Sequence, residues 1–541
     1  MIWLSSNHLC VQLAPISVIA ERVDLSPVEE DVAQLSSALP VSNKLTMVIS
    51  LRAQSSPRPW YSIPRNTRNP SLLLTPQDCR IMSDSDSPNG LRFIIVGASI
   101  AGLAAAIGLK ASGHNVLVLE KESQLEGTNK IRSGCARVPP NGTKILFDWG
   151  LEDQMRKSGA IVEGFSIYTY EGTEFGRDFL GTHHWDPELI RDARGHNMHF
   201  RHQDLLQLLY DELAKPSASK LLGSKPRVAV LFSAEVVQVD SEACKVTLRS
   251  GEAYEGDAII GADGVHGVVR ETLLKEAGCP RTDIPTGLAL YGATVPKSVL
   301  ADDPDLVSFH AGLGATVAMG SNRVALALTI GQTQDISVWI LTPDHFEDGS
   351  WTDLAIQKLS DIVGPCDIGL HKLAKLAGPA SCIQVKDHHE LESWVSNSGR
   401  VAVLGEAAHP FPPAATHTYS VALEDGAFIG QIFSHTRSRD RVPEFLHAFQ
   451  EHRQPRCSHI RDNEKELIGS MTRPDGEVEG GRNTIMRANT AARRDVMHNL
   501  SVDGRALEEI YYIFGYDPAD DADEWWVTWG RFRESAEAST E

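Results

Sequence analysis

The sequence predicts an α/β fold: a Rossmann-like nucleotide-binding domain with an inserted, mainly antiparallel β-sheet substrate domain and C-terminal helices. Three observations lead to this prediction. An apolar strand, a glycine-rich turn, an apolar helix and a second strand follow one another over 91–120, the order of a βαβ unit. Residues 284–386 are rich in β-branched residues between Gly, Asn and Pro turns, as expected of an antiparallel sheet. Helical patterns then occupy Ser420–Arg439 and Val442–Ile468.

These patterns divide the chain into five parts. Residues 1–90 are rich in Ser, Pro and Asn and poor in periodicity, so we expect a low-order extension there. Residues 91–283 hold the first part of the nucleotide-binding domain, with some substrate-domain sequence inserted. The β-rich substrate domain follows at 284–386, the rest of the nucleotide-binding domain at 387–470, and a C-terminal loop and helical segment at 471–541.

The two ends of the chain carry weaker patterns. Residues 1–20 lack a basic start and a continuous apolar run, which disfavours a signal peptide. Met82 is an alternative start, because a chain beginning there would open directly onto the first clear strand. At the other end, the polar run Thr472–Arg494 predicts a loop, and Ala506–Arg533 predicts a closing helical segment with aromatic anchors.

Composition narrows the class of protein. A formal net charge of -20 without a cluster of Lys and Arg argues against a nucleic-acid partner and against binding to an anionic membrane surface. The eight cysteines show no CxxC spacing, which is typical of thiols in a reducing compartment, and we expect a cytoplasmic protein. The longest uncharged apolar stretch, Phe93–Leu109, is too short for a membrane span.

The first motif is a dinucleotide fingerprint. Gly97-Ala-Ser-Ile-Ala-Gly102 follows a strand and opens a helix, and Glu120 ends the next strand. Gly97 permits the tight turn, Gly102 permits close packing of helix on sheet, and the helix N-terminus attracts pyrophosphate. Ser99 occupies the position where a glycine usually allows the closest approach of phosphate. Glu120 is expected to accept hydrogen bonds from ribose hydroxyls.

Two further strand-to-turn segments carry acids. A buried strand runs into Gly261-Ala-Asp263-Gly264 with Arg270 beyond it, and Val401-Ala-Val-Leu runs into Gly405-Glu406-Ala-Ala-His409 and a proline-rich stretch. Three such sites are too many for one NAD. They suit one long ligand that is held at several points.

These motifs resemble those of the class A flavoprotein monooxygenases, the group that includes salicylate hydroxylase and para-hydroxybenzoate hydroxylase. The segment around Asp263 resembles that family's DG motif, and the segment around Glu406 resembles its GD motif. Further similarity lies in Pro139-Pro140-Asn141, in Arg201 ahead of Leu205 and Leu209, in Pro413 through Ala422-Leu423-Glu424-Asp425, and in Phe449 with Arg453, Pro455 and Arg456. The resemblance covers about Leu91 to Arg456.

The resemblance implies FAD as cofactor and NAD(P)H as a transient reductant bound along the DG-motif groove. In the family, O2 adds at flavin C4a, and the resulting hydroperoxide hydroxylates or epoxidises a small aromatic, alkene or polyketide-like substrate. It implies no metal. The expected FAD contacts are Gly97, Ser99, Gly102, Glu120, Gly134, Arg201, Asp263, Glu406 and Tyr419.

Three residues are candidates for the chemistry. Pro413, by resemblance, lies at the reactive face of the flavin, and His417 is the first candidate for a nearby proton donor or acceptor. Tyr291, from the substrate sheet, is the second. The chain also departs from the family: Glu406 replaces Asp, His417-Thr418 replaces Gln-Gly, Gly267 replaces Ser, and the segment 290–292 lacks an arginine.

Several alternatives stay open. The same fold also serves flavin oxidases and ring-remodelling enzymes, and a flavin-binding sensor or scaffold without turnover is a further class. His196, His199 and His202 are spaced like metal ligands, but Arg201 lies between them, so a polar surface or a contact near the cofactor is favoured. His409 is interpreted as a structural hydrogen-bonding residue. Substrate identity, NADH versus NADPH, and oligomeric state are left open.

Overall fold

The computed structural model describes ten stretches of the chain. The N-terminal extension before residue 90, including Met82, lies outside them. The described residues are 90–125, 134–174, 176–216, 226–279, 281, 283–300, 303–344, 357–474, 476–498 and 504–532.

The nucleotide-binding region is built on a five-stranded parallel sheet with the order β19-β12-β1-β2-β8. The first predicted strand and the second are neighbours in it, and the strands ahead of the two later acidic turns lie on the other side of the first. All five are short and mostly buried, as expected where helices cover both faces. The strands are β1 Arg92–Val96, β2 Asn115–Leu119, β8 Val228–Leu231, β12 Ala258–Gly261 and β19 Val401–Val403.

Two helices cross each other closely against this sheet. Helix α4 (Ile100–Ala111) and helix α13 (Thr418–Ile432) meet through glycines. A Cβ on Gly426 would lie 2.6 Å from the Ala104 Cβ, and one on Gly430 would overlap the backbone of Gly108. The close crossing fixes the N-terminus of α13, and the loop before it, next to the dinucleotide fingerprint.

A second, eight-stranded sheet has the order β17-β18-β13-β16-β15-β14-β5-β6 and is antiparallel except for the β14–β5 pair. The antiparallel sheet predicted over 284–386 is therefore confirmed, and two strands from the earlier sequence, β5 and β6, extend it. Its strands are β5 Gly164–Thr169, β6 Phe179–His184, β13 Asp283–Val295, β14 Ala315–Gly320, β15 Arg323–Ile330, β16 Asp335–Pro343, β17 Gln357–Lys358 and β18 Pro379–His388.

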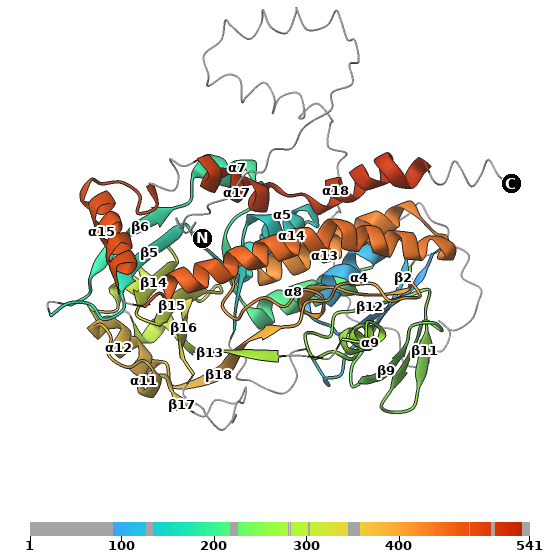
Figure 1. Cartoon of the computed structure of the whole chain (residues 1–541), viewed down its shortest axis with the longest axis horizontal. Helices are drawn as coiled ribbons and strands as arrows, with labels where there is room; N and C mark the ends of the chain where they lie inside the picture. Colours follow the sequence, from blue (N-terminus) through green and yellow to red (C-terminus); the bar gives the residue numbers. More distant parts are fainter. Residues whose placement is uncertain are drawn as a thin grey trace, which may run out of the picture. The chain divides into compact units, whose positions relative to one another are not determined.

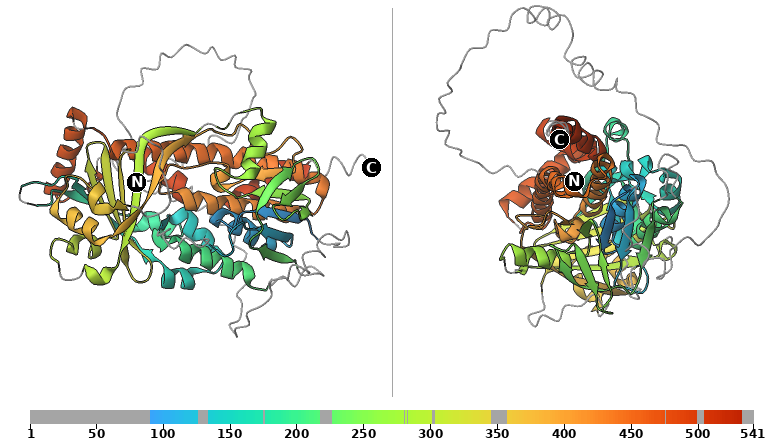
Figure 2. Two further views of the ribbon diagram at one scale, coloured as in Figure 1. Left: turned by 90° about the horizontal axis from the view of Figure 1, so that it is seen from below. Right: turned by 90° about the vertical axis from the view of Figure 1, so that its right-hand side faces the viewer.

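Helix α14 (Val442–Met471) joins the two sheets. Its first turns pack into the core of the parallel sheet through Val442 and Phe445, and its last turns pack on the eight-stranded sheet through Leu467 and Met471. Figure 1 shows α14 beside α13, and Figure 2 shows the two sheets toward opposite ends of this helix.

The predicted loop at Thr472–Arg494 is wrong, because α15 (Glu477–Ala491) occupies most of it. The helix packs on β6, where Thr490 Oγ1 donates to the Leu180 carbonyl at 2.7 Å and Met486 joins the buried cluster on that sheet. Tertiary contacts thus stabilise a helix that its polar, glycine-containing sequence predicts weakly. The closing segment is helical as predicted, in three pieces: α17 Gly504–Gly515, α18 Pro518–Trp525 and a π-helical turn Trp526–Gly530.

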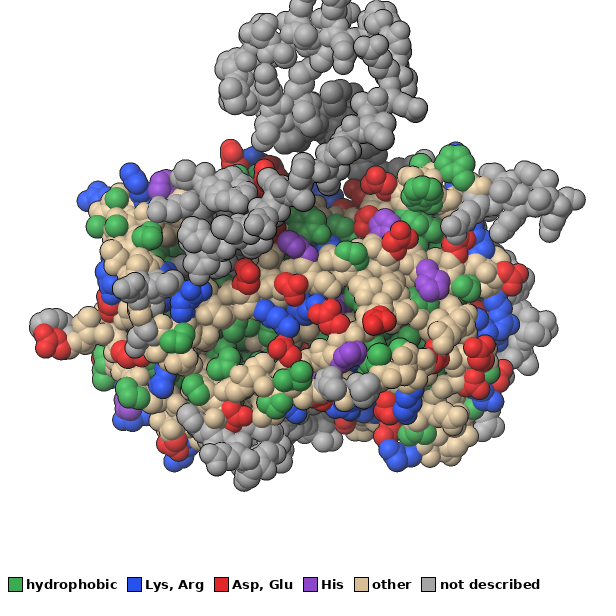
Figure 3. Space-filling model, in the orientation of Figure 1, with side chains coloured by type: hydrophobic (Ala, Val, Ile, Leu, Met, Phe, Trp, Pro, Cys, Tyr) green, Lys and Arg blue, Asp and Glu red, His purple; other side chains and the backbone are tan. Residues whose placement is uncertain are grey.

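Shorter elements complete the described chain. Two three-stranded sheets have the orders β3-β7-β4 and β11-β10-β9. No helix within the described stretches has the length and apolarity that a membrane crossing requires. On the face drawn in Figure 3, acidic and basic side chains are interspersed. The remaining elements are β3 Cys135–Val138, β4 Ala160–Ile161, β7 Met198–Arg201, β9 Val236–Asp240, β10 Lys245–Leu248, β11 Ala253–Glu255, α5 Pro140–Asp148, α6 Glu152–Ser158, α7 Pro187–Asp192, α8 His202–Ala214, α9 Val268–Glu276, α10 Val307–His310, α11 Leu359–Ile362 and α12 Ile368–Leu376, with short 3-10 turns at Lys297–Val299, Gly405–Ala407, Phe433–His435 and Arg439–Arg441.

Candidate active site

The three sequence motifs meet at one edge of the parallel sheet. Strands β1, β12 and β19 are adjacent and parallel, so the turns that follow them leave the sheet side by side. Gly405, after β19, lies against the first turn of α4, where a Cβ on it would come within 2.6 Å of the Ala101 Cβ. The carboxyl edge of an open parallel sheet is where α/β proteins bind their ligands. The motifs therefore form one site.

The fingerprint turn is preorganised for phosphate. Gly97 has φ +104°, and a Cβ there would lie 2.5 Å from the Ala262 carbonyl oxygen. Ser99 caps α4: its hydroxyl accepts from Gly102 N at 3.2 Å and donates to the Ala262 carbonyl at 3.0 Å. The first turn of α4 itself carries no acid, so no side chain of the helix offsets the positive end of its dipole.

Glu120 is held beside this turn. Its two carboxylate oxygens accept from the backbone N–H groups of Ala98, at 2.8 Å, and Glu122, at 2.9 Å. These bonds fix the carboxylate at the end of β2, next to the start of α4. The position agrees with the predicted ribose contact, which stays a prediction.

Asp263 lies in the turn after β12 with one oxygen unsatisfied. Its Oδ2 accepts from Val269 N at 3.1 Å, whereas its buried Oδ1 has no hydrogen-bond partner among the described residues. Desolvation raises the pKa of this carboxyl from 3.8 to about 6. A Cβ on Gly267 would overlap the Asp263 carboxyl group. The serine that the family commonly has at this position would therefore clash with Asp263 in this conformation, whereas Gly267 leaves room for it.

Glu406 differs from what we expected. Glu406 is one of the expected FAD contacts, but its side chain is exposed at the surface of the turn after β19. The backbone beneath it is tightly held, since Gly405 has φ +60° and donates its N–H to Asp425 Oδ2 at 3.0 Å. Arg270 ties this turn to the preceding motif by donating to the Ala407 carbonyl at 2.7 Å.

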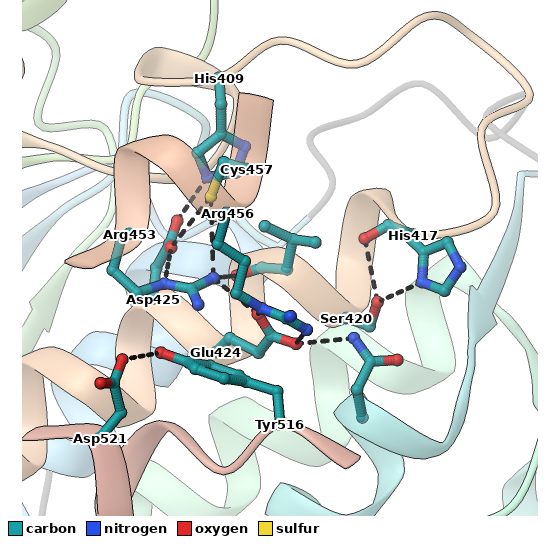
Figure 4. A network of polar contacts seen from close by, with 12 residues as sticks. His409, His417, Ser420, Glu424, Asp425, Arg453, Arg456, Cys457, Tyr516 and Asp521 are labelled. Atoms are coloured by element: carbon teal, nitrogen blue, oxygen red, sulfur yellow. Dashed lines mark hydrogen bonds and ion pairs between the residues drawn. The ribbon is translucent and has the colours of Figure 1, made fainter. Parts of the chain in front are cut away.

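A buried ion network fastens α13 to α14 (Figure 4). Asp425 accepts from His409 Nε2 at 2.5 Å and from Arg453 Nε at 3.0 Å. Glu424 accepts from Arg453 at 2.7 Å and from Arg456 at 2.8 Å. Burial opposes protonation of His409, but Cys457 and Asp425 beside it raise the pKa of His409 to about 10.

This network also contains a set of possible metal ligands. One atom each of His409, Asp425 and Cys457 lie within 4.8 Å of one another. A metal-binding imidazole must be neutral, whereas this one is paired with Asp425, and Arg453 already fills the other side of that carboxylate. The geometry therefore supports the structural role predicted for His409.

His417 precedes α13 and is fully enclosed. Its Nδ1 lies 3.4 Å from Ser420 Oγ, a contact visible in Figure 4, and its Nε2 lies 4.0 Å from Glu464 Oε1. Burial lowers the pKa of His417 well below 6.5, so the ring stays neutral at physiological pH. A neutral imidazole is not a charged proton donor, and the predicted role of His417 as a proton donor or acceptor stays a prediction.

Tyr291 does not face the flavin loop. On β13 it packs with Ile340 and Cys382 against the layer of α11 and α12, on one side of the eight-stranded sheet. Leu290, its neighbour, points to the opposite face, where Trp339 and Ala414 lie. This position does not support the predicted catalytic role of Tyr291.

The other predicted contacts cluster around the start of α8. The Gly134 carbonyl accepts from His202 N at 2.9 Å, and the His202 ring lies 5.5 Å from the ring of Tyr419. Arg201 forms an ion pair with Asp335, at the end of the substrate sheet. The three histidines that are spaced like metal ligands, His196, His199 and His202, have separate surroundings, because His199 contacts the Thr329 carbonyl and His196 contacts Arg156.

Two residues that the sequence analysis did not select hold the loop after Pro413. Arg137, from β3, donates to the Ala414 carbonyl, and its guanidinium lies 5.2 Å from the centre of the Trp339 ring. Glu464, from α14, accepts from Thr416 N at 2.8 Å and from His417 N at 3.0 Å. Arg137 directly precedes Val138 and the Pro139-Pro140-Asn141 segment, which was a usable signal. Glu464 carries no sequence signal, since only folding brings it to the loop.

A protein-family model described as "FAD binding domain" matches residues 91–464. Among curated proteins, the FAD-dependent monooxygenase OpS4 of Beauveria bassiana (strain ARSEF 2860) is 25% identical over 400 residues, covering 73% of this chain and 89% of OpS4. The 3-amino-4-hydroxybenzoate 2-monooxygenase of Streptomyces cremeus is 26% identical over 403 residues, covering 74% of this chain and 92% of that protein.

Solved structures share the fold. A salicylate hydroxylase substrate complex superimposes with a TM-score of 0.60 at 18% identity, covering 81% of this chain and 98% of that one. CtdE in complex with FAD and a substrate gives a TM-score of 0.63 at 18% identity, covering 83% of this chain and 100% of that one.

Proposed function

Because the chain belongs to the FAD-binding-domain family and is an FAD-dependent monooxygenase of the aromatic-hydroxylase type, we propose that it uses NAD(P)H and O2 to hydroxylate or epoxidise a small aromatic or polyketide-like substrate. One observation carries the proposal furthest. The ends of β1, β12 and β19 form a single edge with a phosphate-ready helix terminus, and the loop before α13 connects that edge to the eight-stranded sheet.

The residues present fit FAD. The N-terminus of α4 suits the pyrophosphate, and Glu120, already pinned by two N–H groups, suits the adenosine ribose. Asp263 offers a buried oxygen that has no partner in the described part of the chain, as expected of a group that awaits a ligand hydroxyl or N–H. Glu406 is exposed at the same edge of the parallel sheet.

Bound flavin would supply the redox chemistry and oxygen activation, so the chain itself needs no nucleophile. The protein's part is to position, to enclose and to exclude water. Arg137 and Glu464 hold the backbone of the Ala414–His417 loop, and Trp339 and Leu290 provide an apolar wall opposite it. His417 contributes a neutral ring to this enclosure.

A flavin oxidase or a ring-remodelling enzyme on this fold would use the same FAD contacts. The products distinguish them: a monooxygenase consumes NAD(P)H and adds one oxygen atom to the substrate. We expect the purified protein to be yellow and to release FAD on denaturation. A screen of aromatic acids and polyketide-like phenols should find compounds that stimulate NAD(P)H oxidation. The product should be heavier than the substrate by one oxygen atom, about 16 Da.

The FAD contacts are tested by Glu120→Gln and Glu406→Ala. Each removes a carboxylate acceptor from a ligand hydroxyl or a flanking N–H, a loss of about 1–3 kcal/mol or roughly 5- to 150-fold in affinity. Glu271→Ala, an exposed glutamate on α9, is the control and should retain full flavin. A colourless protein that cannot be reconstituted with FAD, or full flavin content in both site variants, would show the assigned contacts to be wrong.

A further inference from the structure

Two oppositely charged side chains meet on the loop between Pro413 and α13. Arg137 donates to the Ala414 carbonyl, and Glu464 accepts from Thr416 N and His417 N, so both hold the same four-residue stretch. The guanidinium also lies over the Trp339 ring, which places this pair where the loop meets the eight-stranded sheet.

Each of these side chains has one buried polar atom left over. Arg137 Nε and Glu464 Oε2 have no hydrogen-bond partner within the stretches that the structure describes. Both residues are more than nine-tenths buried. Buried polar atoms are normally paired, and the exceptions call for an explanation such as a ligand. One unsatisfied donor and one unsatisfied acceptor call for a ligand that presents an acceptor and a donor.

The charges around this pair nearly balance. Arg137 and Glu464 attract each other, while burial lowers the pKa of Arg137 and raises the pKa of Glu464. The two histidines beside them are neutral: burial, with Arg137 adding to it, lowers the pKa of His199 to about 3, and burial lowers the pKa of His417 well below its usual value. Neither adds a positive charge that could offset a second carboxylate.

The walls next to the pair suit a ring. Leu290, Trp339 and Leu326 lie on the sheet face that carries Ala414, all of them apolar. Aromatic and aliphatic surfaces of this kind bind a planar, apolar ring, and the few polar groups among them set its orientation.

Building on the proposed monooxygenase function, we infer that Arg137 and Glu464 recognise the substrate, and that it carries an uncharged carbonyl oxygen beside a ring hydroxyl rather than a carboxylate. The carbonyl accepts from Arg137 Nε–H, and the hydroxyl donates to Glu464 Oε2. A hydroxyl hydrogen-bonded to a carboxylate makes its ring more electron-rich, which assists electrophilic oxygen transfer. A carboxylate in place of the carbonyl would put a second negative charge beside Glu464.

Salicylamide and salicylate test this inference, because they have nearly the same shape and differ in charge. Their dissociation constants are measured by calorimetry on the FAD-loaded protein without NAD(P)H. We expect wild type to bind salicylamide at least about 10-fold more tightly, given the cost of juxtaposing like charges. Glu464→Gln keeps an oxygen for the Thr416 and His417 N–H groups but removes the charge, so it should bring the ratio close to one or invert it.

Two further variants complete the experiment. Arg137→Gln should weaken salicylamide binding by about 10-fold, through loss of a charge-assisted hydrogen bond. Glu466→Gln is the matched control, since it makes the same change on an exposed residue of α14 and should leave the ratio unchanged.

Equal or tighter binding of salicylate by wild type overturns the inference, and so does failure of both probes to bind. A ratio in Glu464→Gln equal to that of wild type also overturns it. If a variant fails to fold, the ratio of the salicylate and salicylamide dissociation constants of the wild-type protein decides by itself whether the inference holds. Because no turnover is involved, a wild-type preference for salicylamide without any NAD(P)H consumption would refute the proposed function and leave the recognition pair standing.

Discussion

Replacing Asp425 with Asn tests the buried ion network most directly. Asp425 is fully buried and accepts hydrogen bonds from His409, Arg453 and the backbone N–H of Gly405 (Figure 4). Asparagine keeps the shape and one carbonyl acceptor but removes the negative charge. Arg453 and Arg456 then share a single carboxylate, Glu424.

The size of the loss follows from His409. Cys457 and Asp425 together raise its pKa from 6.5 to about 10 in the folded protein, which corresponds to about 5 kcal/mol of favourable interaction, and Asp425 supplies part of it. Removing one partner of a buried ion pair typically costs about 3–5 kcal/mol. The imidazole can lose its proton in the variant, so we expect the lower part of this range, about 3 kcal/mol of unfolding free energy.

The loss should depend on pH with a definite sign. Because the folded pKa of His409 lies above the unfolded value, its stabilisation is fully present below pH 6.5 and is lost as the pH rises through about 10. The difference in stability between wild type and Asp425→Asn should therefore shrink between pH 6.5 and pH 10.

Equilibrium urea denaturation of the flavin-free proteins, followed by far-ultraviolet circular dichroism, measures this difference. Asp387→Asn, which removes an exposed partner of Lys465, is the control and should cost less than about 0.5 kcal/mol. A loss below about 1 kcal/mol for Asp425→Asn would refute the assigned ion network. A difference that grows toward alkaline pH would refute the assignment of the charge to His409.

Two further predictions concern the loop and the DG motif. Ala414 has φ +70°, a strained backbone conformation for any residue but glycine, so Ala414→Gly should raise the free energy of unfolding by about 0.5–1 kcal/mol. Ala415→Gly, the control, should lower it. An equal loss of stability in both variants, measured by urea denaturation, would show that the backbone at Ala414 is not strained. The pKa of Asp263 is raised to about 6, so the folded protein binds its proton more tightly than the unfolded chain. Wild-type stability without flavin should fall by at most about 3 kcal/mol as the pH rises from 4 to 6, and Asp263→Asn should lack this fall. The same pH dependence in both proteins would show that the Asp263 carboxyl is not the source of the fall in stability.

The sequence by itself determined the two sheets and the shared edge of the motifs. The local signals are the strand–turn–helix order over Gly97–Glu120 and the buried strand before each of Asp263 and Glu406. Because these strands pair in parallel, the turns that follow them lie at the same edge of the sheet. The family resemblance rests on those motifs, and the FAD-binding-domain match covers the same stretch.

Only the tertiary structure decided which side chains face that site. Leu290 and Tyr291 are both buried, so the alternation that usually distinguishes the two faces of a strand is absent, and the sequence could not show that Tyr291 points away. Glu464 lies 47 residues beyond His417 along the chain, and only the packing of α14 brings its carboxylate to that backbone N–H. Periodicity records local conformation, whereas distant partners and buried charges are set by packing.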